Sequence, residues 1–407
     1  MKTVPDRTDA VIVGACRTPV GRYGGILRDI RPDDLGAAVI AALVSSSRID
    51  PATIDDVFWG CANQAGEDNR NLGRMSALLA GLPFSVPAAT VNRLCGSSLE
   101  AVVQAARAVR TGDMETVIAG GAESMTRAPY AVAKRQPGGT GNITAFDTAL
   151  GWRFPNPRMK ELFPLESMGE TAENVAERFG ITREEQDRFA YESHVKAVRA
   201  QKSGFFKNEI VPLDVTVRKG EPVRADEDEG PRADTSLEKL AALPPVFRAG
   251  GTVTAGNSSP LNDGASGVLI MSGARARASG LPVLARIAAS GTAGVDPRFM
   301  GMGPVPATRA ALQRAGLSID DVGVIELNEA FAAQSLAVMR ELGLRPDRVN
   351  PQGGAIALGH PLGCSGTRIL TTLLNSMRRL RVQWGVATMC IGVGQGIAVV
   401  VENHSVF

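Results

Sequence analysis

The sequence predicts an α/β protein built from two similar halves, and three observations support this fold class. Residues 54–124 read as a strand, a glycine-rich turn that opens a helix, and a strand that ends in glycines. Residues 319–396 repeat that series in the same order. Between them, residues 125–255 have few long apolar runs. Recurrence of one supersecondary unit predicts two related halves, with a loop-rich insertion between them.

The first half begins with IDDVFWGCANQ (54–64), an apolar run that predicts a strand. VNRLCGSS (91–98) then predicts a turn into a helix, which places Cys95 at the helix N-terminus. Apolar residues recur at helical intervals on one face, and Gly112 offers a stop. ETVIAGGAES (115–124) predicts the closing strand. The apolar face of the helix consists of Leu99, Val102, Val103 and Ala106.

The second half has the corresponding segments. IDDVGVIELNE (319–329) predicts a strand. VNPQGGAIALGHPLGCSGTR (349–368) predicts a glycine-rich turn, and a helix is expected over residues 367–379. GVATMCIGVGQG (385–396) predicts a strand that ends in a glycine cluster. Each half is therefore expected to contain the same strand, turn, helix and strand.

At 407 residues, the chain is long enough for two or three domains with a well-buried core. We expect residues 1–124 to form an N-terminal half that is completed by about residues 256–280. Residues 125–255 are expected to form the inserted loop domain. Residues 281–407 are expected to form the C-terminal half.

Three local patterns describe the insertion. Residues 136–142 predict a loop that contains glycine and proline. Thr182 and Glu185 have the spacing of a capping box, which predicts the start of an amphipathic helix. The acidic run DEDE (226–229) is interpreted as a solvated surface turn.

Composition narrows the function classes. The chain has 44% hydrophobic and 21% charged residues, an ordinary balance for a globular protein. A formal net charge of +2, without arginines interleaved with aromatic residues, argues against nucleic acid as a partner. No apolar stretch is long enough for a bilayer, so no membrane partner is expected. We expect the partners to be small molecules or copies of the chain itself.

The five cysteines are few, odd in number and widely spaced. This spacing fits neither a disulfide framework nor a zinc-binding CxxC pattern, so no metal is expected. The N-terminus lacks the apolar core of a signal peptide, and the last residues, NHSVF, differ from a peroxisomal address. We therefore expect a reducing, cytoplasmic location.

Three histidines limit where a histidine-dependent reaction can take place. His404 lies in a short polar tail, and His194 lies in a helix that reads as solvated. His360 follows the glycine-dense GGAIALG and precedes a proline, so a regular helix interior is not expected there. We therefore choose His360 as the candidate base. The alternative is a turn histidine that bonds only to the backbone.

Two cysteines lie in similar small-residue turns. Cys95 is expected to shift towards the thiolate form, because a helix N-terminus and a nearby imidazole stabilise negative charge. Cys390 precedes several glycines, which let a backbone N–H approach a reacting oxygen. A buried structural cysteine is the alternative for both. The other cysteines, Cys16, Cys61 and Cys364, are interpreted as structural.

Five motifs together resemble the thiolases, the acetyl-CoA C-acyltransferases. They are VNRLCGSS, GGAESM, ELNEAFAAQ, NPQGGAIALGHPLGCSGTR and CIGVGQGIA, in the order and at the spacing of that family. The resemblance runs from Gly14 to the end of the chain. It implies a five-layered α-β-α-β-α fold with two mixed sheets, and a loop domain that covers the coenzyme A (CoA) site. It also implies a homo-oligomer, either a dimer or a tetramer.

The resemblance implies that Cys95 accepts the acyl group and that His360 activates it. Cys390 is implied as the acid/base that exchanges a proton with the acetyl-CoA carbon and with the CoA thiol. Two oxyanion sites are implied, one from His360 with a water held by Asn328, the other from the N–H groups of Cys95 and Gly392. CoA and acetyl-CoA are then substrates, and no permanently bound cofactor is implied.

Contacts to CoA are also implied by the resemblance. Arg232 resembles the family's arginine near the adenine and phosphates, and Ser259 resembles a pantetheine ligand. Ser167 departs from the family, which often has a histidine at that position. The residues that resemble the lining of the substrate tunnel are Met168, Met300 and Phe331.

The expected reaction converts a 3-oxoacyl-CoA and CoA reversibly into an acyl-CoA and acetyl-CoA. Residues 60–83, residues 146–157 and Val393 resemble most the 3-oxoadipyl-CoA (β-ketoadipyl-CoA) thiolases of aromatic degradation. A dicarboxylate acyl chain needs a cation at its far end, because burial of a bare carboxylate is costly. The candidate cations are Arg70, Arg153 and Arg158, each of which can instead be a plain surface residue.

The sequence leaves alternative functions. Within the same family, the alternatives are an acetoacetyl-CoA thiolase (acetyl-CoA acetyltransferase) and a broad 3-ketoacyl-CoA thiolase of fatty acid β-oxidation. A non-catalytic CoA-binding protein of this fold would be expected to lose at least one of Cys95, His360 and Cys390. A Cys/His hydrolase would not need the second cysteine. A condensing enzyme of the ketosynthase type ordinarily has a histidine in place of Cys390.

Overall fold

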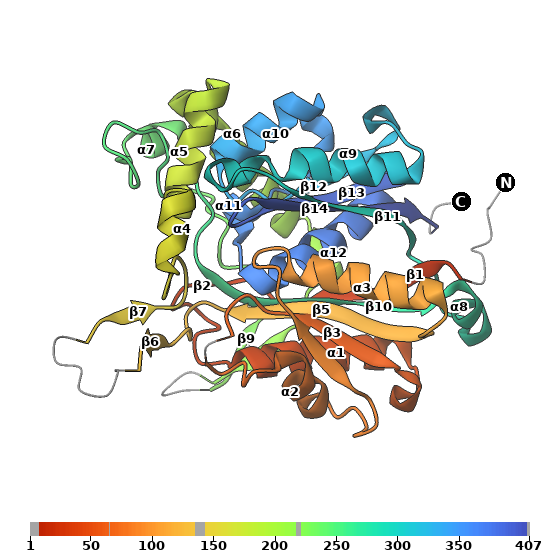
Figure 1. Cartoon of the computed structure of the whole chain (residues 1–407). Coiled ribbons are helices and arrows are strands. Elements are labelled where there is room, and N and C mark those ends of the chain that lie inside the picture. The colour runs from red at the N-terminus through yellow and green to blue at the C-terminus, as the bar shows by residue number, and fades with distance from the viewer. Residues whose placement is uncertain (1–7, 65, 135–142, 217–220, 405–407) are drawn as a thin grey trace.

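Five layers of secondary structure make up the computed structural model, which describes residues 8–64, 66–134, 143–216 and 221–404 (Figure 1). Two outer layers of helices and one central layer of helices enclose two β-sheets. Each sheet is therefore covered on both faces, which explains its largely apolar strands. The outer layers contain α1 (Pro32–Ser47) and α2 (Leu72–Leu79) on one side and α9 (Pro304–Ala315) and α10 (Ala332–Leu342) on the other, and the central layer contains α3 (Ser97–Thr111) and α12 (Leu362–Leu380).

The two sheets have the same strand order, which confirms the internal repeat. The first runs β1 (Ala10–Arg17), β10 (Asn262–Ser272), β5 (Thr116–Ser124), β3 (Asp56–Gly60), β4 (Ala88–Val91). The second runs β11 (Ala285–Gly294), β14 (Gln395–Asn403), β13 (Trp384–Ile391), β12 (Val324–Leu327). In both, two antiparallel pairings are followed by a parallel one. A parallel bridge from Ile325 to Val349 takes the place of β4 in the second sheet.

A short hydrogen-bonded contact joins the sheets, because Val11 and Ile12 of β1 pair with Arg286 and Ala285 of β11. The two halves therefore form one continuous strand order. The mixed sheets and the five layers confirm the predicted α/β class. β10 pairs with β1 and β5, so residues near 262–272 do complete the first sheet. The exact domain boundaries stay a prediction.

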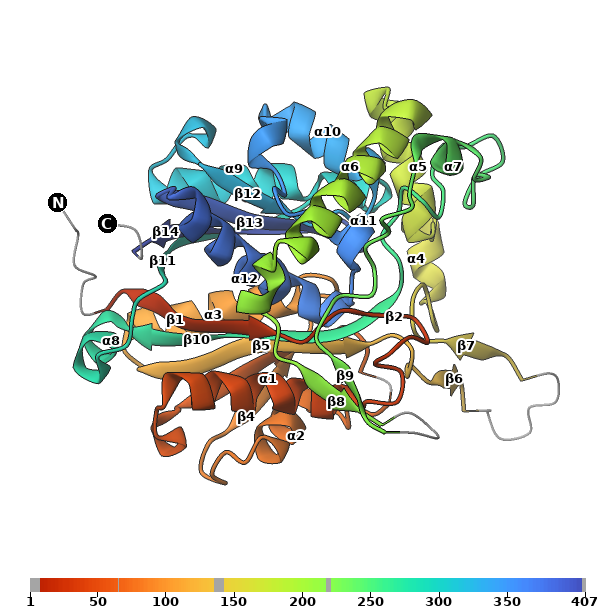
Figure 2. The same ribbon diagram turned by 180° about the vertical axis from the view of Figure 1, so that it is seen from behind.

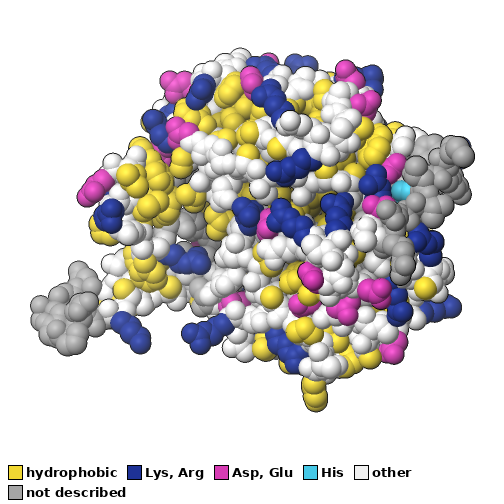
Figure 3. Space-filling model, turned by 45° about the vertical axis from the view of Figure 1, so that its right-hand side comes forward, with side chains coloured by type: hydrophobic (Ala, Val, Ile, Leu, Met, Phe, Trp, Pro, Cys, Tyr) yellow, Lys and Arg dark blue, Asp and Glu magenta, His cyan; other side chains and the backbone are white. Residues whose placement is uncertain are grey.

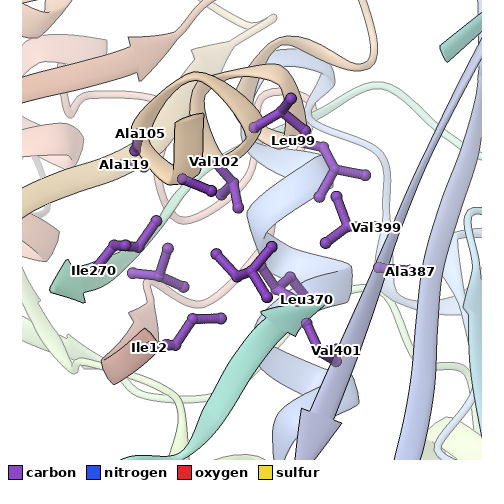
Figure 4. Packing of buried hydrophobic residues seen from close by; sticks show 14 of the residues in the cluster. Ile12, Leu99, Val102, Ala105, Ala119, Ile270, Leu370, Ala387, Val399 and Val401 are labelled. Carbon is purple, nitrogen blue, oxygen red and sulfur yellow. The ribbon is translucent and has the colours of Figure 1, made fainter. Parts of the chain in front are cut away.

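The central helices are apolar on both sides because both sheets pack against them. Figure 4 shows Leu99 and Val102 of α3 and Leu370 of α12 between Ile270 of the first sheet and Val399 of the second. All of these side chains are fully buried. Each contributes about 1.5–3 kcal/mol to stability by leaving water. The core therefore lies between the sheets and holds the two halves together.

A close approach of the central helices fixes their relative position. A Cβ atom at Gly366 of α12 would lie 2.5 Å from the backbone nitrogen of Leu99. In addition, the Thr367 N–H donates to Ser98 Oγ at 3.0 Å. The N-terminal turns of α3 and α12 are thus side by side.

The predicted helix ends agree with the structure in part. α3 ends at Gly112, which has a left-handed backbone with φ of 82°, as expected. α12 starts at Leu362, five residues before the predicted Thr367. The glycine-rich sequence Gly363–Gly366 indicated a turn, but burial between two sheets favours these small residues inside the helix.

The inserted region lies along one side of the layers (Figures 1 and 2), and about half of its described residues lie outside helices and strands. α5 and α6 both contact α10, and Thr182 with Glu185 forms the predicted capping box at the start of α6. The predicted loop 136–142 lies outside the described residues. The elements of this region are β6 (Tyr130–Val132), β7 (Ala145–Asp147), α4 (Pro157–Leu162), α5 (Met168–Phe179), α6 (Arg183–Lys202), the 3-10 helix Phe205–Asn208, β8 (Leu213–Val215), β9 (Val223–Ala225) and α7 (Leu237–Ala241).

The interpretation of the acidic run 226–229 as a solvated turn was wrong for two of its residues. Asp228 is buried and accepts two hydrogen bonds from the Arg17 guanidinium, at 2.7 and 2.8 Å. Arg17 also donates to buried Glu209 at 2.7 Å. Glu229 accepts the Arg22 N–H at 2.8 Å. The run therefore anchors the base of the inserted region to β1, because a buried cation requires paired anions.

The remaining short elements connect the layers. They are β2 (Gly21–Arg22), α8 (Gly273–Ser279), α11 (Ala355–Leu358) and the 3-10 helices Pro51–Thr53, Pro297–Met302, Ile319–Asp321 and Pro346–Arg348. On the face shown in Figure 3, Lys and Arg side chains are interspersed with Asp and Glu, in keeping with a net charge of +2. Among the described helices, none has both the length and the apolar character needed to cross a bilayer.

Candidate active site

Cys95 lies in a tight turn between β4 and α3. Leu94, just before it, has a left-handed backbone with φ of 46°. The Ser97 hydroxyl closes the turn, because it donates to the Leu94 carbonyl at 2.6 Å and accepts the Arg93 N–H at 3.0 Å. α3 starts at Ser97, so Cys95 lies two residues before the helix. The predicted location at a helix N-terminus is confirmed, and the side chain is partly exposed.

The ionisation of Cys95 differs from the expectation. Burial raises the pKa of its thiol to about 11, and the backbone N–H groups of Gly392 and of Cys95 itself lower that pKa by less. The expected shift towards the thiolate was wrong, because desolvation outweighs the favourable N–H groups. The resting group at neutral pH is therefore a thiol.

His360 lies in the equivalent turn of the second half, just before α12. Gly359 has φ of 111°, and a Cβ atom there would lie 2.5 Å from the Asn262 side chain. Asn262 of β10 accepts the His360 N–H at 3.0 Å and donates to the Gly21 carbonyl at 2.9 Å. A strand of the first half thus positions the histidine of the second half. Only glycine fits this backbone shape and this close approach.

The hydrogen bonds of the His360 ring define its tautomer. Nδ1 lies 2.6 Å from Ser365 Oγ, and this hydroxyl lies 2.8 Å from the Pro361 carbonyl. The carbonyl can only accept, so the single hydroxyl proton of Ser365 points to it and Nδ1 donates to Ser365. Nε2 is then unprotonated, with the Asn328 side-chain amide nitrogen 3.4 Å away. Burial, and to a smaller extent the Arg368 charge, lowers the pKa of His360 to about 3.

Cys390 lies at the end of β13 and is 2% exposed. Burial raises the pKa of its thiol far above the usual range, and the neighbouring Cys95 raises it further. The two thiols are therefore close enough to influence each other. Cys390 packs in an apolar cluster with the three predicted tunnel residues, Met168, Met300 and Phe331.

A cavity of about 250 Å³ opens onto Cys95. Gly392 and Met168 line it, and so does Leu362, which follows His360 by two residues. The backbone N–H of Gly392 lies beside the Cys95 sulfur, where it lowers the pKa of the thiol. The motifs of the two halves therefore meet at one cavity.

Ser167 and Ser259 lie near this cavity in different ways. Ser167 lines the cavity, but its hydroxyl accepts the Glu170 N–H at 3.4 Å as part of a capping box at the start of α5. Ser259 donates its N–H to the Ala330 carbonyl at 3.0 Å, next to Phe331 of the tunnel cluster. Its predicted contact with pantetheine stays a prediction.

Arg232 lies apart from Cys95. It lines a second cavity of about 440 Å³ beside α6, which shares no residue with the first. There its N–H donates to His194 Nδ1 at 3.2 Å. His194 is 7% exposed, so the expectation of a solvated helix position was wrong. The predicted contact of Arg232 with the CoA nucleotide stays a prediction.

Sequence reasoning missed three residues of the site. Asn262 positions His360, and Ser365 fixes its tautomer. Phe247 packs its ring edge-on against Phe331, with centroids 6.3 Å apart. The sequence did contain a signal for Ser365. A serine four residues after Pro361 can donate its hydroxyl to the Pro361 carbonyl within one helical turn.

The arrangement combines a thiol that can accept an acyl group, a neutral imidazole that can accept its proton, and a second thiol for another proton transfer. In the described parts of the chain, no cluster of three or more His, Cys, Asp and Glu residues could hold a metal ion. A nucleophile and an acid/base pair can make and break a thioester. The second thiol can donate a proton to the carbanion that forms when a carbon–carbon bond breaks, or remove that proton when the bond forms.

Comparisons with known proteins agree with this chemistry. The thiolase N-terminal domain matches residues 10–274, and the thiolase C-terminal domain matches residues 281–403. A β-ketoadipyl-CoA thiolase of Acinetobacter baylyi is 56% identical over 97% of this chain and 99% of its own length. An acetyl-CoA acetyltransferase of Pseudomonas aeruginosa is 52% identical over 96% and 98%, respectively.

The fold has close counterparts among solved structures. Human mitochondrial 3-ketoacyl-CoA thiolase superposes with a TM-score of 0.92 and 40% sequence identity, over 98% of this chain and 100% of that chain. This similarity confirms the five-layered fold that the resemblance implied. With matches to both thiolase domains and with a relative that is 56% identical over 97% of this chain, the protein is a member of the thiolase family of acyltransferases.

Proposed function

We propose that the protein cleaves 3-oxoadipyl-CoA with CoA to give succinyl-CoA and acetyl-CoA, through an acyl group carried on Cys95. The observation that carries this proposal is the cavity at Cys95, to which Gly392 and the tunnel residue Met168 also contribute. The name of the 56% identical relative supports the dicarboxylic substrate. The resemblance of residues 60–83 and 146–157 to thiolases of aromatic degradation points the same way.

In the first half-reaction, Cys95 Sγ attacks the 3-oxo carbon and transfers its proton to His360 Nε2. The bond between carbons 2 and 3 then breaks, which leaves an acyl-Cys95 thioester and the carbanion of acetyl-CoA. Cys390 donates its proton to that carbanion, and acetyl-CoA leaves. Because both Cys95 and His360 are neutral at rest, proton transfer accompanies the attack instead of preceding it.

In the second half-reaction, the Cys390 thiolate takes the proton of the CoA thiol. The CoA sulfur attacks the acyl-Cys95 carbonyl, the shortened acyl-CoA leaves, and Cys95 recovers its proton from His360. Atoms and charges balance over the cycle, and the same steps in reverse form the carbon–carbon bond.

Each half-reaction places negative charge on an oxygen that needs hydrogen-bond donors. The backbone N–H groups of Cys95 and Gly392 are donors beside the nucleophile. A second oxyanion site is assigned to His360 with a water held by Asn328, whose amide lies 3.4 Å from Nε2. Each donor is expected to contribute about 3 kcal/mol to the transition state.

The second candidate is an acetoacetyl-CoA thiolase, which the 52% identical acetyl-CoA acetyltransferase favours. A broad 3-ketoacyl-CoA thiolase is a third, by fold similarity to the human enzyme. A non-catalytic CoA-binding role is disfavoured, because Cys95, His360 and Cys390 are all present.

A steady-state comparison tests the proposal. CoA-dependent cleavage of 3-oxoadipyl-CoA, acetoacetyl-CoA and a long-chain 3-oxoacyl-CoA is measured with the same preparation. We expect the highest kcat/KM for 3-oxoadipyl-CoA, and a succinyl adduct on the Cys95 peptide by mass spectrometry. Equal or higher kcat/KM for acetoacetyl-CoA would replace the proposal with the second candidate.

Three further assignments belong to this proposal. The protein is expected to act in the cytoplasm, as its free thiols suit a reducing compartment. It is expected to form a homo-oligomer, a dimer or a tetramer, and to hold CoA as substrate without a permanent cofactor. Size-exclusion chromatography with light scattering measures the number of copies.

The predicted contact of Arg232 with the CoA nucleotide has its own test. A raised KM for CoA in Arg232→Gln, with kcat unchanged, would support this contact.

A further inference from the structure

One wall of the cavity at Cys95 is formed by the segment between β7 and α4. Thr148, Trp152 and Arg153 of this segment line the cavity together with Asn63. Arg153 Nη1 donates to the Thr148 carbonyl at 3.1 Å, and its Nη2 donates to Asn63 Oδ1 at 3.4 Å. Asn63 in turn donates to Thr148 Oγ1 at 3.2 Å. The guanidinium is therefore held in the cavity wall by two residues that also line it.

Among the described residues, the charge of Arg153 has no carboxylate partner. Both of its hydrogen-bond acceptors are neutral. Across the described ranges, no Asp or Glu oxygen lies within the 4.0 Å of an ion pair with Arg153. Glu166, which lines the same cavity, is instead 3.6 Å from Arg298 and accepts a hydrogen bond from Asn174 at 3.1 Å. The cavity thus contains a partly exposed cation that is available to an incoming anion.

The other two candidate arginines lie outside this cavity. Arg70 is exposed, and its left-handed backbone, with φ of 70°, is held by a hydrogen bond from its N–H to Asp68. Arg158 is exposed in the first turn of α4. Neither contributes to the wall around Cys95. The structure therefore separates Arg153 from the two other candidates.

Much of the remaining wall is apolar and suits a short methylene chain, and Glu166 and Ser167 add polar groups to it. Its apolar side chains include Leu94, Ala149, Leu150, Trp152 and Val393. An apolar surrounding strengthens a charge–charge interaction and penalises a buried carboxylate without a partner. A carboxylate at the end of a short acyl chain on Cys95 would find its counter-ion in this wall.

We propose that Arg153 binds the terminal carboxylate of the acyl group and thereby selects dicarboxylic acyl chains over chains that end in a methyl group. This inference rests on the proposed function, because it assumes a substrate with a second carboxylate. The planar guanidinium has further N–H groups for a bidentate contact, since only two of its hydrogen bonds are in use.

The test compares two substrates of equal chain length, 3-oxoadipyl-CoA and 3-oxohexanoyl-CoA, which differ only in the terminal group. In Arg153→Gln, kcat/KM for 3-oxoadipyl-CoA is expected to fall about 30-fold or more, as for loss of one partner of a buried charge pair. The value for 3-oxohexanoyl-CoA should change less than threefold or rise. Arg153→Lys, which keeps the charge, should recover part of the selectivity.

The matched control is Arg158→Gln, which removes an exposed arginine from the neighbouring helix and should leave both values unchanged. An equal loss of kcat/KM for both substrates in Arg153→Gln would show that Arg153 only supports the wall. Unchanged kcat/KM values for both substrates would also overturn the inference. If the unaltered protein does not prefer 3-oxoadipyl-CoA at all, the proposed function fails first. The two failures are therefore distinguishable.

Discussion

The turns before α3 and before α12 occupy equivalent places in the two halves, yet they present their side chains differently. Leu94 and Gly359 both have a positive φ, of 46° and 111°, but the ψ of 163° at Gly359 lies outside the left-handed helical region. Cys95 is partly exposed in the cavity, whereas His360 is 5% exposed. The repeat thus places a turn before a central helix in each half. One turn brings the nucleophile Cys95 to the cavity, and the other buries the base His360.

The largest effect is expected from the turn before α3. Cys95→Ala should lower kcat/KM for 3-oxoacyl-CoA cleavage by about 10⁴-fold or more, because it removes the thiol that carries the acyl intermediate. Cys16→Ala, at a cysteine that does not line the cavity, is the control and should keep full activity. Residual activity within tenfold of the unaltered protein would exclude Cys95 as the nucleophile.

The second prediction concerns pH. Since the pKa of Cys95 is raised to about 11, its thiolate fraction should grow about tenfold per pH unit from pH 7 to pH 10. The rate of inactivation by iodoacetamide should therefore rise by about 10³-fold over this range. Mass spectrometry of the Cys95 peptide assigns the reaction. A plateau already at pH 7 would instead indicate a thiolate–imidazolium pair and contradict two neutral groups.

The third prediction concerns the tautomer in the turn before α12. Ser365→Ala removes the acceptor of the His360 Nδ1–H, so the ring can place its proton on Nε2. We expect kcat/KM to fall about 10- to 100-fold, because Nε2 then cannot accept the thiol proton. Ser365→Thr should recover activity, since it keeps the hydroxyl. An unchanged rate and pH profile in Ser365→Ala would remove the role of Ser365 in orienting the ring.

The smallest effect is expected at Val393, which lies in the cavity wall with φ of 63°. A β-branched residue in this conformation stores about 1–3 kcal/mol of strain. Val393→Gly should relieve it, and the greater freedom of glycine in the unfolded chain offsets part of the gain. We expect a net stabilisation of about 1 kcal/mol in urea unfolding. Destabilisation of that size would show that Val393 packing outweighs the strain.

Patterns close together in the sequence were predictable. Gly112 ends α3 as expected, and Thr182 with Glu185 caps α6, because both signals act within a few residues. The order of motifs in the two halves also predicted two equivalent sheets, which the strand order confirms. For the same reason, the locations of Cys95 and His360 in helix-opening turns could be read from local sequence.

Features that depend on distant partners were not predictable. Asp228 lies in an acidic run typical of surface turns, but its partner Arg17 is 211 positions away in β1. His194 looked solvated because nothing near it in the sequence indicates that the Arg232 segment covers it. The ionisation of Cys95 was mistaken because the helix N-terminus is a local signal, whereas burial depends on the whole fold.

The absence of a Cβ atom at Gly366 affects the reaction geometry as well as the packing of the helices. Its contact with Leu99 sets the distance between the two central helices, and each helix begins just after one reacting group. A bulkier residue would separate the helices and, with them, the acyl acceptor from its proton acceptor. A bulkier residue at this position is therefore expected to impair catalysis as well as folding.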